Sequence, residues 1–195
     1  MRNFLKAVLL IFSLFFLSSC SLRGAISEMF NKDTIGSRLE MLNKSTDEET
    51  ANARLEQILD IIKLQDKEAL KALFSVNALN DSDDFDENAD CLFKFVQGDI
   101  DSWEKESGPT VFDSNDRGKV TKKVHSYYYV DSDKDRYFIL LRDYPVDTKT
   151  ADNVGLHLLL VVKADDRLKI YDKDQKILFD GDKDIHRTGV YVPFA

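Results

Sequence analysis

The sequence predicts an α+β domain in which helices pack on one face of a mainly antiparallel sheet. Three observations support this prediction. Apolar residues recur at helical spacing in the first half of the chain, and beyond Gly98 their period changes from about 3.6 to about 2. Several helices followed by a run of hairpin-connected strands is an order typical of α+β folds.

The first long helix is expected to begin at Thr46. Thr46 and Glu49 have the spacing of a capping box. Behind them, the apolar residues at helical spacing are Ala51, Leu55, Ile58, Leu59 and Ile62. The preceding residues 20–45 have scattered apolar positions without a period, so we expect a tether there, with at most a short helix over residues 38–42.

Two shorter helices are expected next. Asp66 is placed to cap a helix over residues 67–74, and a further helix over residues 84–97 would end at Gly98. Cys91 has apolar neighbours in this last helix, so we expect it to be buried and unreactive.

The pattern of the rest of the chain predicts strands separated by polar turns, and one of these turns covers residues 114–118. The expected strands are residues 99–106, 110–113, 119–130, 136–144, 154–163 and 167–171. Runs 136–144 and 154–163 are apolar on both sides, which predicts central strands that are covered on both faces. In the run 119–130, Val124, Tyr128 and Val130 fall on one side and His125, Tyr127 and Tyr129 on the other.

The N-terminus predicts export. Arg2 and Lys6 precede an apolar run over residues 7–17, and small residues follow, as in a secretory signal peptide spanning residues 1–19. The apolar run is shorter than the roughly 20 residues that cross a bilayer, so an uncleaved transmembrane anchor is the weaker interpretation.

The residues Leu17, Ser18, Ser19 and Cys20 resemble the lipobox of bacterial lipoproteins. The resemblance implies cleavage before Cys20 and a diacylglyceryl thioether on its sulfur, with acyl chains such as palmitate. Two acyl chains anchor a protein stably without a membrane-spanning helix. The implied location is the extracytoplasmic face of the cell membrane, with the membrane as a partner and residues 46–195 as a single exported domain.

Composition excludes several classes of protein. A formal net charge of −8 without a basic stripe argues against nucleic-acid binding. The Asp-rich turns lack the Gly and Glu positions of a calcium loop, and the three His have no zinc-type spacing. We therefore expect no metal, and no motif points to a cofactor.

Four local strings carry a family resemblance. They are residues 67–75, 95–100, 108–111 and 152–156. Together they resemble an uncharacterised family of bacterial, mostly Gram-positive, lipoproteins with an NTF2-like (cystatin-like) domain. The resemblance covers about residues 46–195 and implies an NTF2-like cone, with N-terminal helices packed on a curved, mainly antiparallel sheet. Its motifs are turn and core patterns, so it supplies no catalytic residue.

Aromatic residues are concentrated in the strand half. If the concave face of the sheet forms a pocket, the candidate lining residues are Trp103, His125, Tyr127, Tyr129 and His157. Aromatic residues also suit ordinary strands, so core and surface packing is the competing interpretation.

Three functions are compatible with these patterns. The leading hypothesis is a non-enzymatic binding or interaction domain, for a small-molecule or protein partner that the sequence does not identify. The alternative is a small hydrolase or isomerase that uses the cone cavity, and a third hypothesis is a structural or immunity-type protein that caps a secreted partner. Acid and base groups converging in an open cavity would favour the enzyme, whereas a filled cavity would favour an interaction protein.

Overall fold

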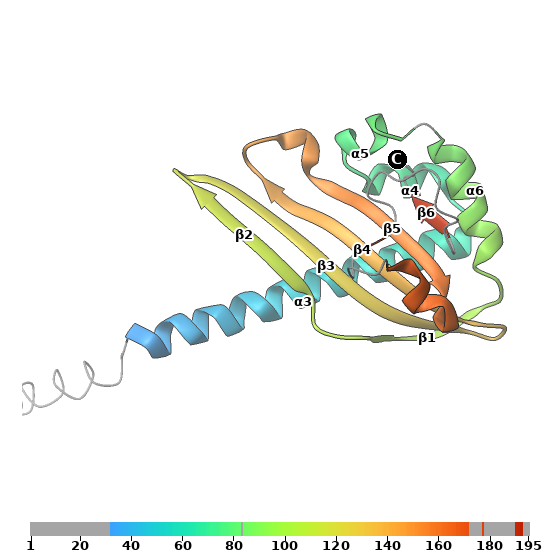
Figure 1. The fold of residues 1–195 in the computed structure, drawn as a ribbon, viewed down its shortest axis with the longest axis horizontal. Helices are drawn as coiled ribbons and strands as arrows, with labels where there is room; N and C mark the ends of the chain where they lie inside the picture. Colours follow the sequence, from blue (N-terminus) through green and yellow to red (C-terminus); the bar gives the residue numbers. More distant parts are fainter. Residues whose placement is uncertain (1–31, 83, 172–176, 178–189, 193–195) are drawn as a thin grey trace, which may run out of the picture. The chain divides into compact units, whose positions relative to one another are not determined.

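The structure is a computed structural model that describes residues 32–82, 84–171, 177 and 190–192, with side chains from Thr46 onward. Its fold is α+β, as predicted (Figure 1). Residues from Asp47 onward form one compact unit, and residues up to Thr46 form another. The signal peptide and Cys20 lie outside the described residues.

The helices precede the sheet. They are α3 (Lys32–Leu64), α4 (Lys67–Leu73), α5 (Val76–Asn80) and α6 (Phe85–Phe95). Asp66 caps α4 as predicted, since its side chain accepts a hydrogen bond from the Ala69 amide at 2.9 Å. None of the helices in the described part of the chain is long and apolar enough to cross a membrane.

The described strands form a six-stranded sheet in which every pair is antiparallel. The strands are β1 (Ile100–Lys105), β2 (Thr110–Asp116), β3 (Lys119–Ser132), β4 (Arg136–Asp147), β5 (Gly155–Lys163) and β6 (Val190–Val192). The order is β1-β3-β4-β5-β6, and β2 also pairs with β3. The long β3 therefore pairs with three strands: β4 on one edge, and on the other edge β2 along its first half and β1 along its last.

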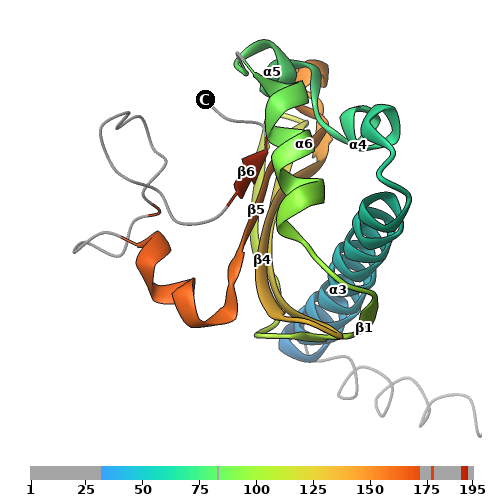
Figure 2. The same cartoon turned by 90° about the vertical axis from the view of Figure 1, so that its right-hand side faces the viewer.

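The two faces of the sheet have different covers. The helix face packs against α3, α4 and α6 through one apolar cluster, whose sheet members include Tyr128, Val130, Ile139 and Leu159. We call the opposite side the outer face, where a second cluster joins Phe138, Leu140, Leu158 and Leu160 to Ile170 and Tyr191. Figure 2 shows α3 and α6 on one side of the sheet and the segment after β5 on the other. The prediction that residues 136–144 and 154–163 are covered on both sides is therefore confirmed.

The phase of the first long helix is confirmed, but its predicted start is wrong. Leu55 and Ile58 are fully buried in the helix-face cluster, as the spacing predicted. The helix begins at Lys32 rather than Thr46, and it takes up part of the expected tether. Residues 32–45 contain no Pro and a single Gly, so no strong breaker stops the helix before the capping-box residues.

Two acidic side chains within the predicted capping box form ion pairs with the sheet and do not begin a helix. Asp47 accepts a hydrogen bond from Lys122 Nζ at 2.7 Å, and Glu48 pairs with Lys105. About two helical turns later, Arg54 Nε lies 2.8 Å from a carboxylate oxygen of the buried Asp143. These pairs attach α3 to β1, β3 and β4.

Two strand predictions need correction. Residues 167–171 do not form a strand, because Ala164–Ile170 is a 3₁₀ helix, η2, and the edge of β5 is occupied by β6. β2 continues to Asp116, so the turn is shorter than the predicted residues 114–118. The hairpin turns through Arg117 and Gly118, both with positive φ, which is the backbone that matches the twist of a two-residue hairpin.

Two further features of the helical half differ from the sequence prediction. α5 was not predicted, and the Ser75 hydroxyl caps it by accepting from the Ala78 amide at 3.1 Å. Cys91 is exposed rather than buried, because α6 turns Ala89, Leu92 and Phe93 inward.

Candidate functional site

Three of the predicted pocket residues share one face. His125, Tyr127 and Tyr129 alternate along β3 with the buried Ser126 and Tyr128. They lie on the outer face, away from the helices, and not on the helix-lined concave side where the pocket was expected. Strand alternation fixes which residues share a face, but it does not determine which face the helices cover.

Trp103 does not join these residues. In β1 it pairs with Val130 of β3, and directly opposed side chains lie on the same face of a sheet. Its ring meets that of Tyr128 edge to face, with centroids 5.6 Å apart, and it packs against the helix-face cluster. The thickness of the sheet therefore separates Trp103 from His125, Tyr127 and Tyr129.

His157 has a different neighbourhood from His125. It is the extra residue of a bulge in β5, where Leu156 and Leu158 pair with adjacent residues of β4. Its ring lies 4.3 Å from that of Tyr144, and its Nε2 is 2.9 Å from the carbonyl oxygen of Asn153, which makes the imidazole the donor. This bond holds the ring against the turn before β5.

His125 lies among cations and an aromatic ring. The Phe112 ring is 5.1 Å from the imidazole, and the buried Nε2 has no hydrogen-bond partner in the described part of the chain. Burial, together with the nearby Arg142 and Lys123, lowers the pKa of His125 to about 4. The imidazole is therefore neutral at physiological pH.

The far end of the outer face is closed by η2. Arg167 of η2 donates to the Tyr129 hydroxyl at 3.1 Å, pairs with Glu106 and lies over the Phe138 ring. Tyr127 stacks on the same Phe138 ring, with centroids 6.5 Å apart. At this end the tyrosines are therefore packing and hydrogen-bonding residues.

The other end of the outer face is open. Phe112 is 48% exposed, and the ammonium group of Lys123 lies 4.7 Å from the centre of its ring. We call Phe112, Lys123 and His125 the Phe112 patch. It combines an exposed ring with Lys123, which forms no ion pair among the described residues, whereas its neighbour Lys122 pairs with Asp47.

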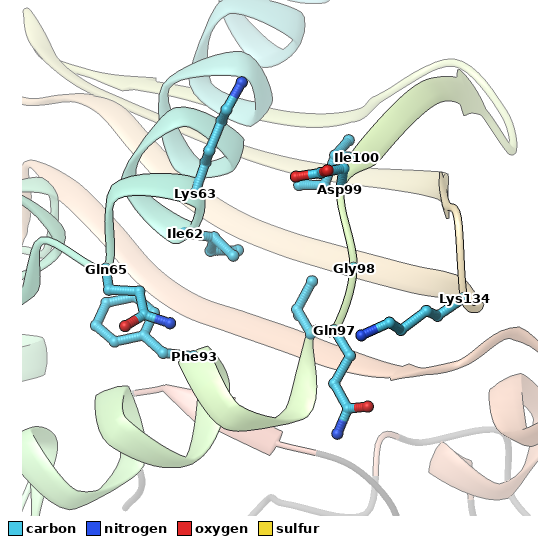
Figure 3. Close-up of a pocket in the computed structure, with 10 residues that line it drawn as sticks. Ile62, Lys63, Gln65, Phe93, Gln97, Gly98, Asp99, Ile100 and Lys134 are labelled. Carbon is cyan, nitrogen blue, oxygen red and sulfur yellow. The ribbon is translucent and has the colours of Figure 1, made fainter.

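A hollow lies on another part of the molecule, between the ends of α3 and α6 and the start of β1 (Figure 3). Its volume is about 290 Å³. The apolar lining comes from Ile62, Phe93, Val96 and Ile100, and the polar lining from Lys63, Gln65, Gln97, Asp99 and Lys134. Gly98 also lines the hollow, in the connection between α6 and β1. We call it the Gly98 hollow.

Comparison with protein families identifies the group to which the chain belongs. The model of DUF5104, a domain of unknown function, matches residues 57–164. The chain is a member of the DUF5104 family. The match covers more than half of the chain, and it includes the Phe112 patch and every residue of the Gly98 hollow, but not Arg167 of η2 or β6. No curated protein matches the chain.

The Gly98 hollow of this DUF5104 chain was not predicted from the sequence. Its lining comes from three segments far apart in the chain, and none of them carries a recognisable motif. The one local sign was Gly98, which was interpreted as a helix stop. Its φ of +86° shows that the backbone there needs a glycine after the helix has ended at Phe95.

Proposed function

We propose that this DUF5104 protein is a lipid-anchored, extracytoplasmic binding protein without enzymatic activity. The anchor is proposed from the signal peptide and the lipobox-like residues that end at Cys20. The binding role is proposed from the domain that the anchor would carry.

The filled helix face is the observation that carries the binding role. Twenty-three buried residues form one apolar cluster between the helices and the sheet. An enzyme of the cone type needs a chamber there with acid and base groups inside it. In the described residues this space is occupied by side chains such as Leu55, Tyr128 and Leu159.

The histidines give the enzyme hypothesis little support. A catalytic histidine base normally has a carboxylate or a similar group to orient it. His125 instead faces Lys123 and Arg142, and the bond of His157 goes to a backbone carbonyl. The NTF2-like cone remains part of our proposal for the fold, supported by the helices on one side of the curved sheet.

The Phe112 patch is the proposed contact surface. An exposed ring beside a cation favours a partner that presents an acidic group next to apolar atoms. Such a partner also brings negative charge to Lys123, on a chain whose net charge is −8.

A photo-crosslinking experiment in intact cells tests this proposal. The full chain would carry a benzoylphenylalanine at Phe112 or, as a control, at Val76, which is 52% exposed on α5. We expect a discrete crosslinked product from position 112 alone, and we expect the Lys123→Glu variant to reduce its yield several-fold. Equal yields from positions 112 and 76, or an unchanged yield from position 112 in the Lys123→Glu variant, would contradict the proposal.

A further inference from the structure

We propose that the Gly98 hollow binds a small zwitterion with an apolar side chain, such as a free amino acid or a short peptide. This site is separate from the Phe112 patch, and the inference does not depend on the function proposed for that patch. It rests on the rim, the floor and the charges of the hollow.

The rim of the hollow is held in place before any ligand arrives. Tyr137 accepts a hydrogen bond from the Gln97 amide at 2.8 Å, and Ser132 donates to the Gln97 carbonyl at 2.8 Å. Asp133 accepts from the Asp99 amide at 2.9 Å, and its own amide donates to the Asp99 carbonyl at 3.0 Å. A pre-organised rim lowers the entropy that a ligand must lose on binding.

Gly98 allows the turn before β4 to close over this rim. A Cβ atom at Gly98 would lie 1.9 Å from an Asp133 carboxylate oxygen and 3.2 Å from Lys134 Cγ. The glycine therefore lets the stem of Lys134 pass directly over the backbone. Figure 3 shows the Lys134 ammonium group beside Gln97 and Gly98, the Asp99 carboxylate directed toward α3, and Gln65 on the opposite side of the hollow at the end of α3.

The two charges in the hollow are available to a ligand. Neither Asp99 nor Lys134 forms an ion pair within the described part of the chain, whereas Lys122 and Lys163 are both paired with carboxylates. A zwitterion satisfies both groups, because its carboxylate pairs with Lys134 and its ammonium with Asp99.

The floor and the size specify the rest of the ligand. Phe93 and Val96 are buried and Ile62 is 5% exposed, so the floor suits an aliphatic group. A volume of about 290 Å³ is just below the roughly 300–1,000 Å³ typical of ligand pockets. The hollow therefore fits a molecule of amino-acid or dipeptide size.

Three probes of one shape test the inference on the full chain in detergent. They are L-leucine, 4-methylpentanoate, which lacks the ammonium, and 3-methylbutylamine, which lacks the carboxylate. Saturation-transfer NMR titrations would give the three dissociation constants. We expect leucine to bind about tenfold more tightly than either analogue, since each lost charge removes a charge-assisted hydrogen bond.

Two variants test whether Lys134 binds the carboxylate of the ligand and Asp99 binds its ammonium group. Lys134→Gln should weaken leucine and 4-methylpentanoate about tenfold and leave the amine unchanged, while Asp99→Asn should weaken leucine and the amine. Both side chains are exposed, so neither change should unfold the domain. Lys94→Gln is the matched control, because Lys94 is an exposed lysine of α6 outside the hollow.

The inference is overturned by any of three results. These are no binding of leucine below about 10 mM, equal affinity for the three probes, or variants that bind like the Lys94→Gln control.

Discussion

His125 illustrates how a single side chain depends on its neighbours. Its ring is half-buried beside Phe112, and two cations lie close to it. Burial and the two cations all oppose protonation. Strand alternation alone places Lys123 on the same face as His125, but only the pairing of β2 and β4 with β3 brings Phe112 and Arg142 beside the ring. The residue was expected in a pocket, and the structure places it at the edge of an exposed patch.

The lowered pKa of His125 predicts a pH effect on stability. As the pH falls below 6.5, His125 becomes protonated in the unfolded chain, whereas in the folded chain it becomes protonated only near pH 4. The free energy of unfolding should therefore fall across this window, and above it the contribution is fully present. Because the ring is partly in contact with solvent, we expect a loss on the order of 1 kcal/mol.

Urea denaturation of the wild type and the His125→Gln variant at pH 7 and pH 4.5 measures this effect. The variant lacks the titrating group, so it should lose less stability between the two pH values. An NMR titration of His125 with a midpoint near 6.5 would show that the ring is not protected as described.

At the scale of elements, α3 contributes five buried residues to the apolar cluster of the helix face. Its inward residues contact the sheet core directly, and Arg54 and Asp47 add ion pairs to β4 and β3. The helix begins at Lys32, N-terminal to the start predicted from the capping box at Thr46. A capping-box sequence therefore does not have to begin a helix when the residues before it also favour helix.

Substitutions in α3 test its orientation. Leu55 is fully buried, so Leu55→Ala should lower the free energy of unfolding by about 2–5 kcal/mol through lost contacts and a cavity. The adjacent Glu56 is exposed, and Glu56→Ala should change it by less than about 0.5 kcal/mol. Chemical denaturation curves measure both values, and similar midpoints for the two variants would refute the orientation.

At the scale of the whole molecule, the proposal joins an anchor to a domain with a filled interior. The domain offers its chemistry at its surface, in the Phe112 patch and the Gly98 hollow. Under this proposal the lipid anchor keeps the domain at the membrane, so the anchor is part of the proposed function. Lipidation is therefore tested separately from binding.

The test of the anchor uses the two cysteines of the chain. Cells fed a clickable fatty acid should label the wild type and the Cys91→Ala variant, and Cys20→Ala should abolish the label because the acceptor sulfur is gone. Cys91 is an exposed thiol of α6, which makes it the appropriate control. Partition of the processed wild type into the aqueous phase of a detergent separation would contradict lipidation.

The sequence by itself determined the α+β class, the helical phase of Leu55 and Ile58, the cap at Asp66 and the grouping of His125 with Tyr127 and Tyr129. These features depend on residues close together in the chain, where the periods of helix and strand act directly. The tertiary structure alone decided that this group lies on the outer face, that Trp103 lies on the other side, and that residues 167–171 give way to β6 beside β5. It also decided the Gly98 hollow, whose walls come from α3, α6 and the turn before β4. Each of these outcomes depends on which distant segments pack together, and packing between distant segments leaves no periodic trace in the sequence.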